Sequence, residues 1–233
     1  MQIDITFDHR LDASGKDPDS ASATLKIHHQ TLWSKPLPSG EKFELAPERG
    51  SYLVLRSNRG QFVLSSDAIS NSLRGHKRLA NIIDQIPAQS LDAFQWLGAT
   101  IGARIVFPAK RIQNRPTINV ARGFNAKIRD RFDLTLECIR LHYLGLPSPL
   151  ASALDRYDDF FALFESFNGY VEFFLLQDIA KDGEIDFFLP FTSDFSTPVL
   201  PNTVDKYQNY MANSMHFIEA RNQRILGWAN RQI

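Results

Sequence analysis

The pattern of apolar and polar positions predicts helices over much of the chain. These helices cover residues 20–33, 75–85, 90–97, 150–164 and 203–232. The last of them is the longest, and a threonine stands at its start in the N-cap position, where its hydroxyl can accept a backbone N–H.

Short strands are predicted in the middle of the chain. Residues 52–55 and 61–64 flank the turn sequence SNRG and form a predicted hairpin. The sequence SSD at 65–67 is interpreted as a helix-capping cluster. Residues 104–107 and 116–118 are further strands, on either side of the loop AKRIQN.

The segment 117–143, TINVARGFNAKIRDRFDLTLECIRLHY, is predicted as a strand, a tight turn and one long helix. At roughly 100° per residue, Asp130, Asp133, Glu137 and Arg140 fall in a wedge of roughly 80° between two apolar faces. A helix that is apolar over most of its circumference is central to its fold. The polar wedge therefore faces a strip of water or a polar cavity.

The run GYVEFFLLQDIAKDGEIDFFLPF at 169–191 begins with apolar residues that fit a buried helix or a buried strand equally well. Its second half, KDG followed by EIDFF, predicts a turn and a strand. Together the elements predict one α+β domain over residues 1–233, mostly helical, with a small, mainly antiparallel sheet and a long C-terminal helix. Residues 1–20 form an irregular polar leader after a short strand.

Composition narrows the function classes. The chain has 26 basic and 26 acidic residues, so its zero formal charge argues against generic, non-specific nucleic-acid binding and against binding to an anionic membrane. Many of its 18 phenylalanines lie late in the chain and predict a dense aromatic core. Cys138 is the single cysteine, which fits a reducing cytosol and inert packing. Without a signal core or an apolar stretch of membrane length, the expectation is a soluble, cytoplasmic protein.

The acidic wedge is the first candidate site. Asp133 and Glu137 lie four residues apart, so they can point at one spot, with Asp130 a turn earlier. Such carboxylates share a hard cation such as Mg²⁺ or raise one another's pKa for acid–base catalysis. The structural alternative, given more weight, is ion pairing with Arg129, Arg140 or another arginine. No spacing predicts zinc, and no haem or dinucleotide motif is present.

A candidate anion site precedes the predicted helix. Arg122 stands before Gly123, with Asn119 and Asn125 nearby. Backbone N–H groups at a helix start attract phosphate or carboxylate, and an arginine can hold either group through two bonds. The structural alternative is a capping turn whose arginine pairs with a local acid.

The C-terminal helix places Arg221 and Asn222 on or beside its apolar stripe. A buried guanidinium or amide needs partners, and the acidic wedge or Asp178 with Gln177 is expected to supply them. Arg221 is therefore interpreted as an inter-helix clamp in preference to a catalytic group.

His29 is the best general acid–base candidate, because histidine titrates near neutral pH. It lies one helical turn before Trp33. A structural histidine packed on that tryptophan is the favoured alternative.

Several long stretches carry a resemblance to a known family: TLKIHHQTLWSKPLPSG, TINVARGFNAKIRDRFDLTLECIRLHY, GYVEFFLLQD and FIEARNQRI. Over nearly its whole length the chain resembles an uncharacterised bacterial domain-of-unknown-function family. It departs from that family's pattern at Ala23, His28 and Val120. The resemblance implies a soluble bacterial protein and no activity, and the departure at His28 predicts that this position is not essential.

The sequence leads to two hypotheses about function. The first is an intracellular protein that binds or hydrolyses a phosphate-bearing ligand, a nucleotide or nucleic acid, with Arg122 holding the anion and the wedge supplying a base or a metal site. The second is a non-catalytic protein-interaction module of a toxin or phage-defence system. Its binding surface would be an exposed aromatic patch of Phe187, Phe188 and Phe191.

Overall fold

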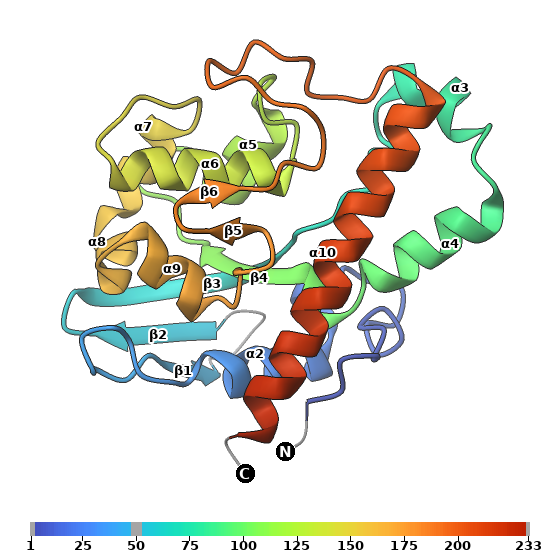
Figure 1. Cartoon of the computed structure of the whole chain (residues 1–233). Coiled ribbons are helices and arrows are strands. Elements are labelled where there is room, and N and C mark those ends of the chain that lie inside the picture. Colours follow the sequence, from blue (N-terminus) through green and yellow to red (C-terminus); the bar gives the residue numbers. More distant parts are fainter. Residues whose placement is uncertain (1–2, 48–52, 232–233) are drawn as a thin grey trace.

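The computed structural model describes residues 3–47 and 53–231 and combines a small sheet with many helices (Figure 1). The α-helices are α1 (Pro18–Ala21), α2 (Ala23–Trp33), α3 (Ala80–Ile83), α4 (Ala88–Leu97), α5 (Ile118–Phe124), α6 (Phe132–Tyr143), α7 (Ala151–Leu154), α8 (Asp158–Phe161), α9 (Phe167–Phe173) and α10 (Val204–Asn230). Short 3-10 helices are η1 (Lys77–Leu79), η2 (Ile101–Ala103), η3 (Asp155–Tyr157) and η4 (Ala162–Phe164). The strands are β1 (Glu44–Pro47), β2 (Leu53–Ser57), β3 (Gly60–Ala68), β4 (Arg104–Pro108), β5 (Ala180–Lys181) and β6 (Glu184–Ile185). The predicted α+β class is confirmed, and within the described ranges no helix is long and apolar enough to cross a membrane.

The main sheet is antiparallel, in the order β1-β2-β3-β4. The predicted hairpin is confirmed, with β2 and β3 joined by a turn that ends at Gly60, whose φ of 130° favours glycine. Tyr52, the first residue predicted for this hairpin, lies outside the described residues. The predicted helix cap at 65–67 is wrong, because these three residues extend β3 and pair with β4. A strand partner 40 residues further along the chain overrides the local capping preference of Ser and Asp.

The segment 117–143 contains two helices instead of one. Thr117 caps α5, so the strand predicted at 116–118 is wrong. Between α5 and α6 the chain turns through Arg129 and Asp130, both at positive φ. Asp130 therefore lies in a turn and not on the helical wedge predicted for it.

The first described residues form turns packed against the core, and no strand occurs between residues 3 and 17. Residues 18–20 of the segment predicted to be irregular belong to α1, and the polar sequence before them conceals buried positions. His9 is fully buried, and its backbone N–H donates to the carbonyl oxygen of Ala99.

The predicted aromatic core is confirmed. The ambiguous first half of the run 169–191 begins as helix, and α9 ends at Phe173. Phe173 and Phe174, in and beside α9, pack against Trp33 and Phe164 with ring centres 5.0 to 6.1 Å apart. Such offset and edge-on pairs stabilise a core beyond the area that they bury.

The prediction of an exposed aromatic patch at residues 187–191 is wrong. Phe188 is buried, whereas Phe187 and Phe191 are half-buried and pack on one another with ring centres 4.4 Å apart. The strand predicted over EIDFF is also shorter than expected and ends at Ile185.

Helix α10 runs along the molecule, with α3 and α4 on one side of it and α5 to α9 on the other (Figure 1). Its predicted N-cap is confirmed, since the Thr203 hydroxyl accepts from the N–H of Lys206. Where α10 passes η2, the Asn222 side chain accepts from the N–H of Gly102 at 2.8 Å. A Cβ atom on Gly102 would lie 2.4 Å from that Asn222 oxygen and 2.8 Å from the carbonyl oxygen of Ile218, so only glycine fits this contact.

We expect Gly102→Ala to lower the free energy of unfolding by about 2 kcal/mol or more, because the added methyl group forces α10 away from η2. The matched control is Gly123→Ala within α5, where a Cβ meets no atom within 4 Å. Alanine there should raise the free energy of unfolding by about 0.5 to 1 kcal/mol, since it is the better helix former. Equal effects of the two substitutions in urea unfolding would contradict the close approach of α10 to η2.

Candidate functional site

Strand β3 is where several predicted site residues meet. On one of its faces, His29 Nε2 lies 3.0 Å from the Ser66 hydroxyl. On the other face, Asn119 donates to Ser65 at 3.4 Å, and Arg122 pairs with the Asp67 carboxylate. Because successive strand residues point to opposite faces, the strand separates His29 from Asn119 and Arg122.

Arg122 is fully buried and has a partner for each nitrogen of its guanidinium group. Nη1 donates to the Asp67 carboxylate and to the carbonyl oxygen of Ala68, and Nη2 donates to the carbonyl oxygen of Asp130 at 3.0 Å. Nε donates to the Thr135 hydroxyl at 3.1 Å and lies 3.4 Å from the Asp130 carboxylate. These contacts favour the structural alternative, a local ion pair, over an open anion site at Arg122.

Asp133 and Glu137 are both buried and have separate arginine partners. Asp133 pairs with Arg131 and accepts the backbone N–H of Phe188 at 2.9 Å. Glu137 accepts two bonds from Arg140, at 2.7 and 2.8 Å. Groups of three or more side chains able to hold a metal ion are absent from the described part of the chain. The arginine pairs favour a structural role for both carboxylates over the predicted metal site.

Asp130 is the most accessible of the three acids, with its side chain 30 % exposed. Burial raises the pKa of its carboxyl group, while the positive charge of Arg122 acts in the opposite direction. One carboxylate oxygen accepts from the Asn71 amide at 2.7 Å. Asn71 lines a cavity described below, so Asp130 is connected to that cavity through one hydrogen bond.

Asn119 and Arg122 contact the same face of β3, whereas Asn125 bonds to other parts of the chain. The Asn125 amide donates to the carbonyl oxygen of Pro149 at 3.0 Å, and its oxygen accepts the N–H of Lys127. Asn125 thus fixes the turn after α5.

Arg221 is held by backbone groups. Its Nη1 donates to the carbonyl oxygens of Gly102 and Arg104 at 2.8 and 2.7 Å, and Nε and Nη2 donate to carbonyl oxygens just after α9. The prediction that acidic side chains are the partners of Arg221 is wrong, since Asp178 pairs with Arg224 instead. Arg221 therefore joins α10 to β4 and to the end of α9.

His29 and Cys138 are buried and electrically neutral. Burial lowers the pKa of His29 well below its ordinary value. Trp33 Nε1 donates to His29 Nδ1 at 2.9 Å, so Nε2 carries the hydrogen that faces Ser66. Burial also raises the pKa of the Cys138 thiol to about 12, which leaves almost no nucleophilic thiolate.

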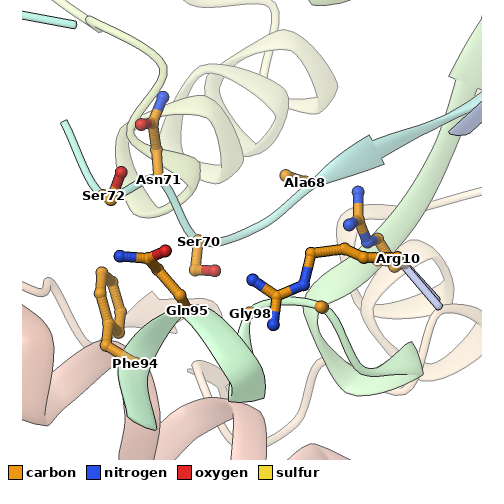
Figure 2. A pocket seen from close by; sticks show the side chains of 10 residues that line it. Arg10, Ala68, Ser70, Asn71, Ser72, Phe94, Gln95 and Gly98 are labelled. Carbon is orange, nitrogen blue, oxygen red and sulfur yellow. The ribbon is translucent and has the colours of Figure 1, made fainter. Parts of the chain in front are cut away.

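A cavity of about 330 Å³ lies between α4 and the chain that follows β3, and we name it the arginine cavity. Figure 2 shows Gln95 on α4 facing Ser70 and Asn71. The lining residues are Arg10, Ala68, Ser70, Asn71, Ser72, Phe94, Gln95, Gly98, Ala99 and Arg104. Sequence reasoning missed both arginines. The available signal was the charge of Arg104 at the start of an otherwise apolar strand.

The wall formed by residues 70–72 is held from behind. Tyr207 and Tyr210 donate their hydroxyl hydrogens to the carbonyl oxygens of Ser72 and Asn71 at 2.6 and 2.9 Å. This wall is therefore fixed before any ligand arrives, which reduces the entropy lost on binding.

The two arginines of the cavity retain unused hydrogen-bond donors. Arg104 is buried, its Nη1 pairs with Asp19 at 2.8 Å, and its Nε has no hydrogen-bond partner among the residues that the structure describes. Arg10 is paired with Asp8, and 46 % of its side chain is exposed. Burial raises the pKa of Asp19 to about 6, while the charge of Arg104 acts to lower it.

Comparison with protein families identifies the class to which this α+β fold belongs. The model of a family of unknown function, DUF6994, matches residues 3–225. The chain therefore belongs to this family, which agrees with the predicted resemblance. Comparisons with curated proteins and with solved structures gave no match.

We expect Asp133→Asn to lower the free energy of unfolding by about 3 to 5 kcal/mol, because it leaves the charge of Arg131 buried without a counter-ion. Glu137→Gln should cost only about 1 kcal/mol, since 27 % of its partner's side chain is exposed and water can replace the lost bond. Thermal unfolding with and without millimolar Mg²⁺ completes the test, and no magnesium effect is expected. A rise in melting temperature with Mg²⁺ that disappears in Asp133→Asn would restore the metal site.

Proposed function

We propose that this protein binds a small phosphate-bearing ligand, such as a nucleotide, in the arginine cavity. One observation carries the proposal: two arginines line one cavity, and the buried one has an Nε without a hydrogen-bond partner. Arginine suits phosphate because its planar group donates two parallel bonds. A volume of about 330 Å³ is at the small end of ligand sites, which fits a nucleotide or sugar phosphate better than a polymer.

The proposed anion site differs from the one predicted at Arg122. The nitrogens of Arg122 all have protein partners, whereas Arg10 and Arg104 keep free donors. Binding is supported better than hydrolysis, because Asp133 and Glu137 are paired with arginines.

The charge state of Asp19 makes the proposed binding depend on pH. At neutral pH its carboxylate offsets the charge of Arg104, to which it is paired. Its pKa of about 6 means that it becomes neutral as the pH falls through about 6, and Arg104 then attracts an anion more strongly. Affinity should therefore rise as the pH falls.

Calorimetric titration with sulfate tests the proposal, since sulfate imitates a phosphate dianion and keeps its charge over this pH range. Arg10→Ala should weaken binding about tenfold, which is roughly 1.4 kcal/mol, by removing one charged donor. Asp19→Asn should bind sulfate more tightly than the wild type at neutral pH and lose the pH dependence. A nucleoside monophosphate then tests for the larger ligand.

Arg59→Ala is the matched control, because Arg59 is an exposed arginine in the β2–β3 turn, outside the cavity. It should bind sulfate as the wild type does. Equal binding by Arg10→Ala and Arg59→Ala would place any sulfate site elsewhere and overturn the proposal.

We also propose that the protein is bacterial and cytoplasmic, and the single buried thiol of Cys138 supports a reducing compartment.

A protein-interaction module of a toxin or phage-defence system is the second proposed function. Phe124 supports it in place of the aromatic patch first predicted, because this ring at the end of α5 is 83 % exposed. Absence of anion binding, together with a stable partner lost in Phe124→Ser, would favour this second function.

A further inference from the structure

Lys35 occupies an unusual position for a lysine. It follows α2, and its backbone is fixed on both sides, by its own N–H to the carbonyl oxygen of Trp33 and by the N–H of Phe43 to its carbonyl oxygen. Its ammonium nitrogen lies 5.2, 4.7 and 5.2 Å from the ring centres of Trp33, Phe173 and Trp228. The cation is therefore held among three aromatic rings.

Within residues 3–47 and 53–231, this ammonium group has no acidic partner. Among the described residues, no carboxylate lies within ion-pairing distance of Lys35. Its charged neighbour is another cation, since Arg221 lies 5.9 Å from the ring centre of Trp33, which also contacts Lys35. Burial, with a smaller contribution from Arg221, lowers the pKa of Lys35 to about 7.

Lys35 lines a second cavity, of about 530 Å³, which we name the lysine cavity. Its walls include Pro36, Leu37, Phe173 and Trp228, and Glu172 also lines it. This volume is within the range of small-molecule sites. Apolar and aromatic walls around one unpaired cation are the features that recognise an apolar body carrying a negative charge.

The charge count selects the class of anion. Lys35 and Arg221 together exceed the single carboxylate of Glu172 by one positive charge, which a monoanion balances and a phosphate dianion would exceed. The faces of Trp228 and Phe173 favour a planar body. An aromatic monocarboxylate satisfies these conditions together.

We propose that the lysine cavity binds a small aromatic monocarboxylate, with the carboxylate on Lys35 Nζ and the ring against Trp228 and Phe173. The site is separate from the arginine cavity and shares no lining residue with it. Binding at the lysine cavity is therefore independent of the anion binding proposed for the arginine cavity.

Binding of this kind has a characteristic pH dependence. The charged groups that face Lys35 are Arg221 on α10 and Glu172 on α9. Burial lowers the pKa of Arg221 to about 9, so Arg221 stays protonated near pH 7, where Lys35 titrates. The carboxylate binds the ammonium form, so affinity is greatest below the pKa of free Lys35. Above about pH 7 it should fall by up to about tenfold per pH unit, until the raised pKa of the complex is reached.

Calorimetric titration of the whole protein with benzoate and with phenylacetate, at several pH values from about 6 to 9, tests the proposal. Uncharged benzamide and dianionic phenyl phosphate are the comparison ligands. Both carboxylates should bind the wild type at least tenfold more tightly than either comparison ligand below pH 7. Trp228 fluorescence should change on binding, because the ring forms one wall.

Two substitutions separate charge from structure. Lys35→Met should lose carboxylate binding by at least tenfold and still fold, because it removes a charge that has no acidic partner in the described part of the chain. Lys35→Arg should keep binding but lose its pH dependence over this range, since a guanidinium group does not titrate there. Lys16→Met, at an exposed lysine, is the control and should behave as the wild type does.

Three results would overturn the proposal. The first is carboxylate binding that is unchanged in Lys35→Met. The second is wild-type affinity that stays constant between pH 6 and 9. The third is tighter binding of phenyl phosphate than of either carboxylate, which would point to a phosphate site.

Discussion

A guanidinium group buried inside a protein must find oxygen acceptors for its N–H donors, because an unsatisfied buried charge costs several kcal/mol. Three arginines of this fold, Arg122, Arg131 and Arg221, are almost completely buried and meet that requirement in different ways. Arg221 bonds only to backbone carbonyls, whereas Arg122 and Arg131 combine carboxylates with carbonyls. Each connects segments far apart in the sequence, so the relative positions of α10, β3, β4 and α6 depend on them.

This constraint also indicates which polar residues remain free for a ligand. A charged side chain whose hydrogen bonds are all made inside the protein, such as Arg122, has no donor left for a ligand. Arg104 and Lys35 differ, because Arg104 keeps an unpaired Nε and Lys35 has aromatic rings in place of a carboxylate. Both line cavities. Ligand recognition is therefore proposed at cavity edges, and the charge-rich segment 117–143 serves mainly to hold the fold.

Local sequence signals predicted those elements whose cause is local. The Thr203 cap, the hairpin after β2 and the aromatic core required only neighbouring residues or composition. The strand identity of 65–67 depends on pairing with β4, and the turn at Asp130 depends on backbone angles that its residue type does not specify. The cavities were beyond sequence reasoning for the same reason, since Arg10 and Arg104 meet only after folding. A helical projection placed Asp133 and Glu137 in a wedge facing water or a polar cavity, whereas both are buried and paired. It named Arg140 as a possible partner but could not show that Arg131 pairs with Asp133.

The free energy of unfolding of Arg221→Met, compared with that of Arg224→Met in the same helix, tests the central claim most directly. Arg221 bonds to four buried carbonyl groups, whereas Arg224 makes a partly exposed ion pair with Asp178. We expect a loss of about 3 kcal/mol or more for Arg221→Met and of about 1 kcal/mol or less for Arg224→Met. Equal losses in denaturant unfolding would contradict the claim that buried arginines hold this fold together.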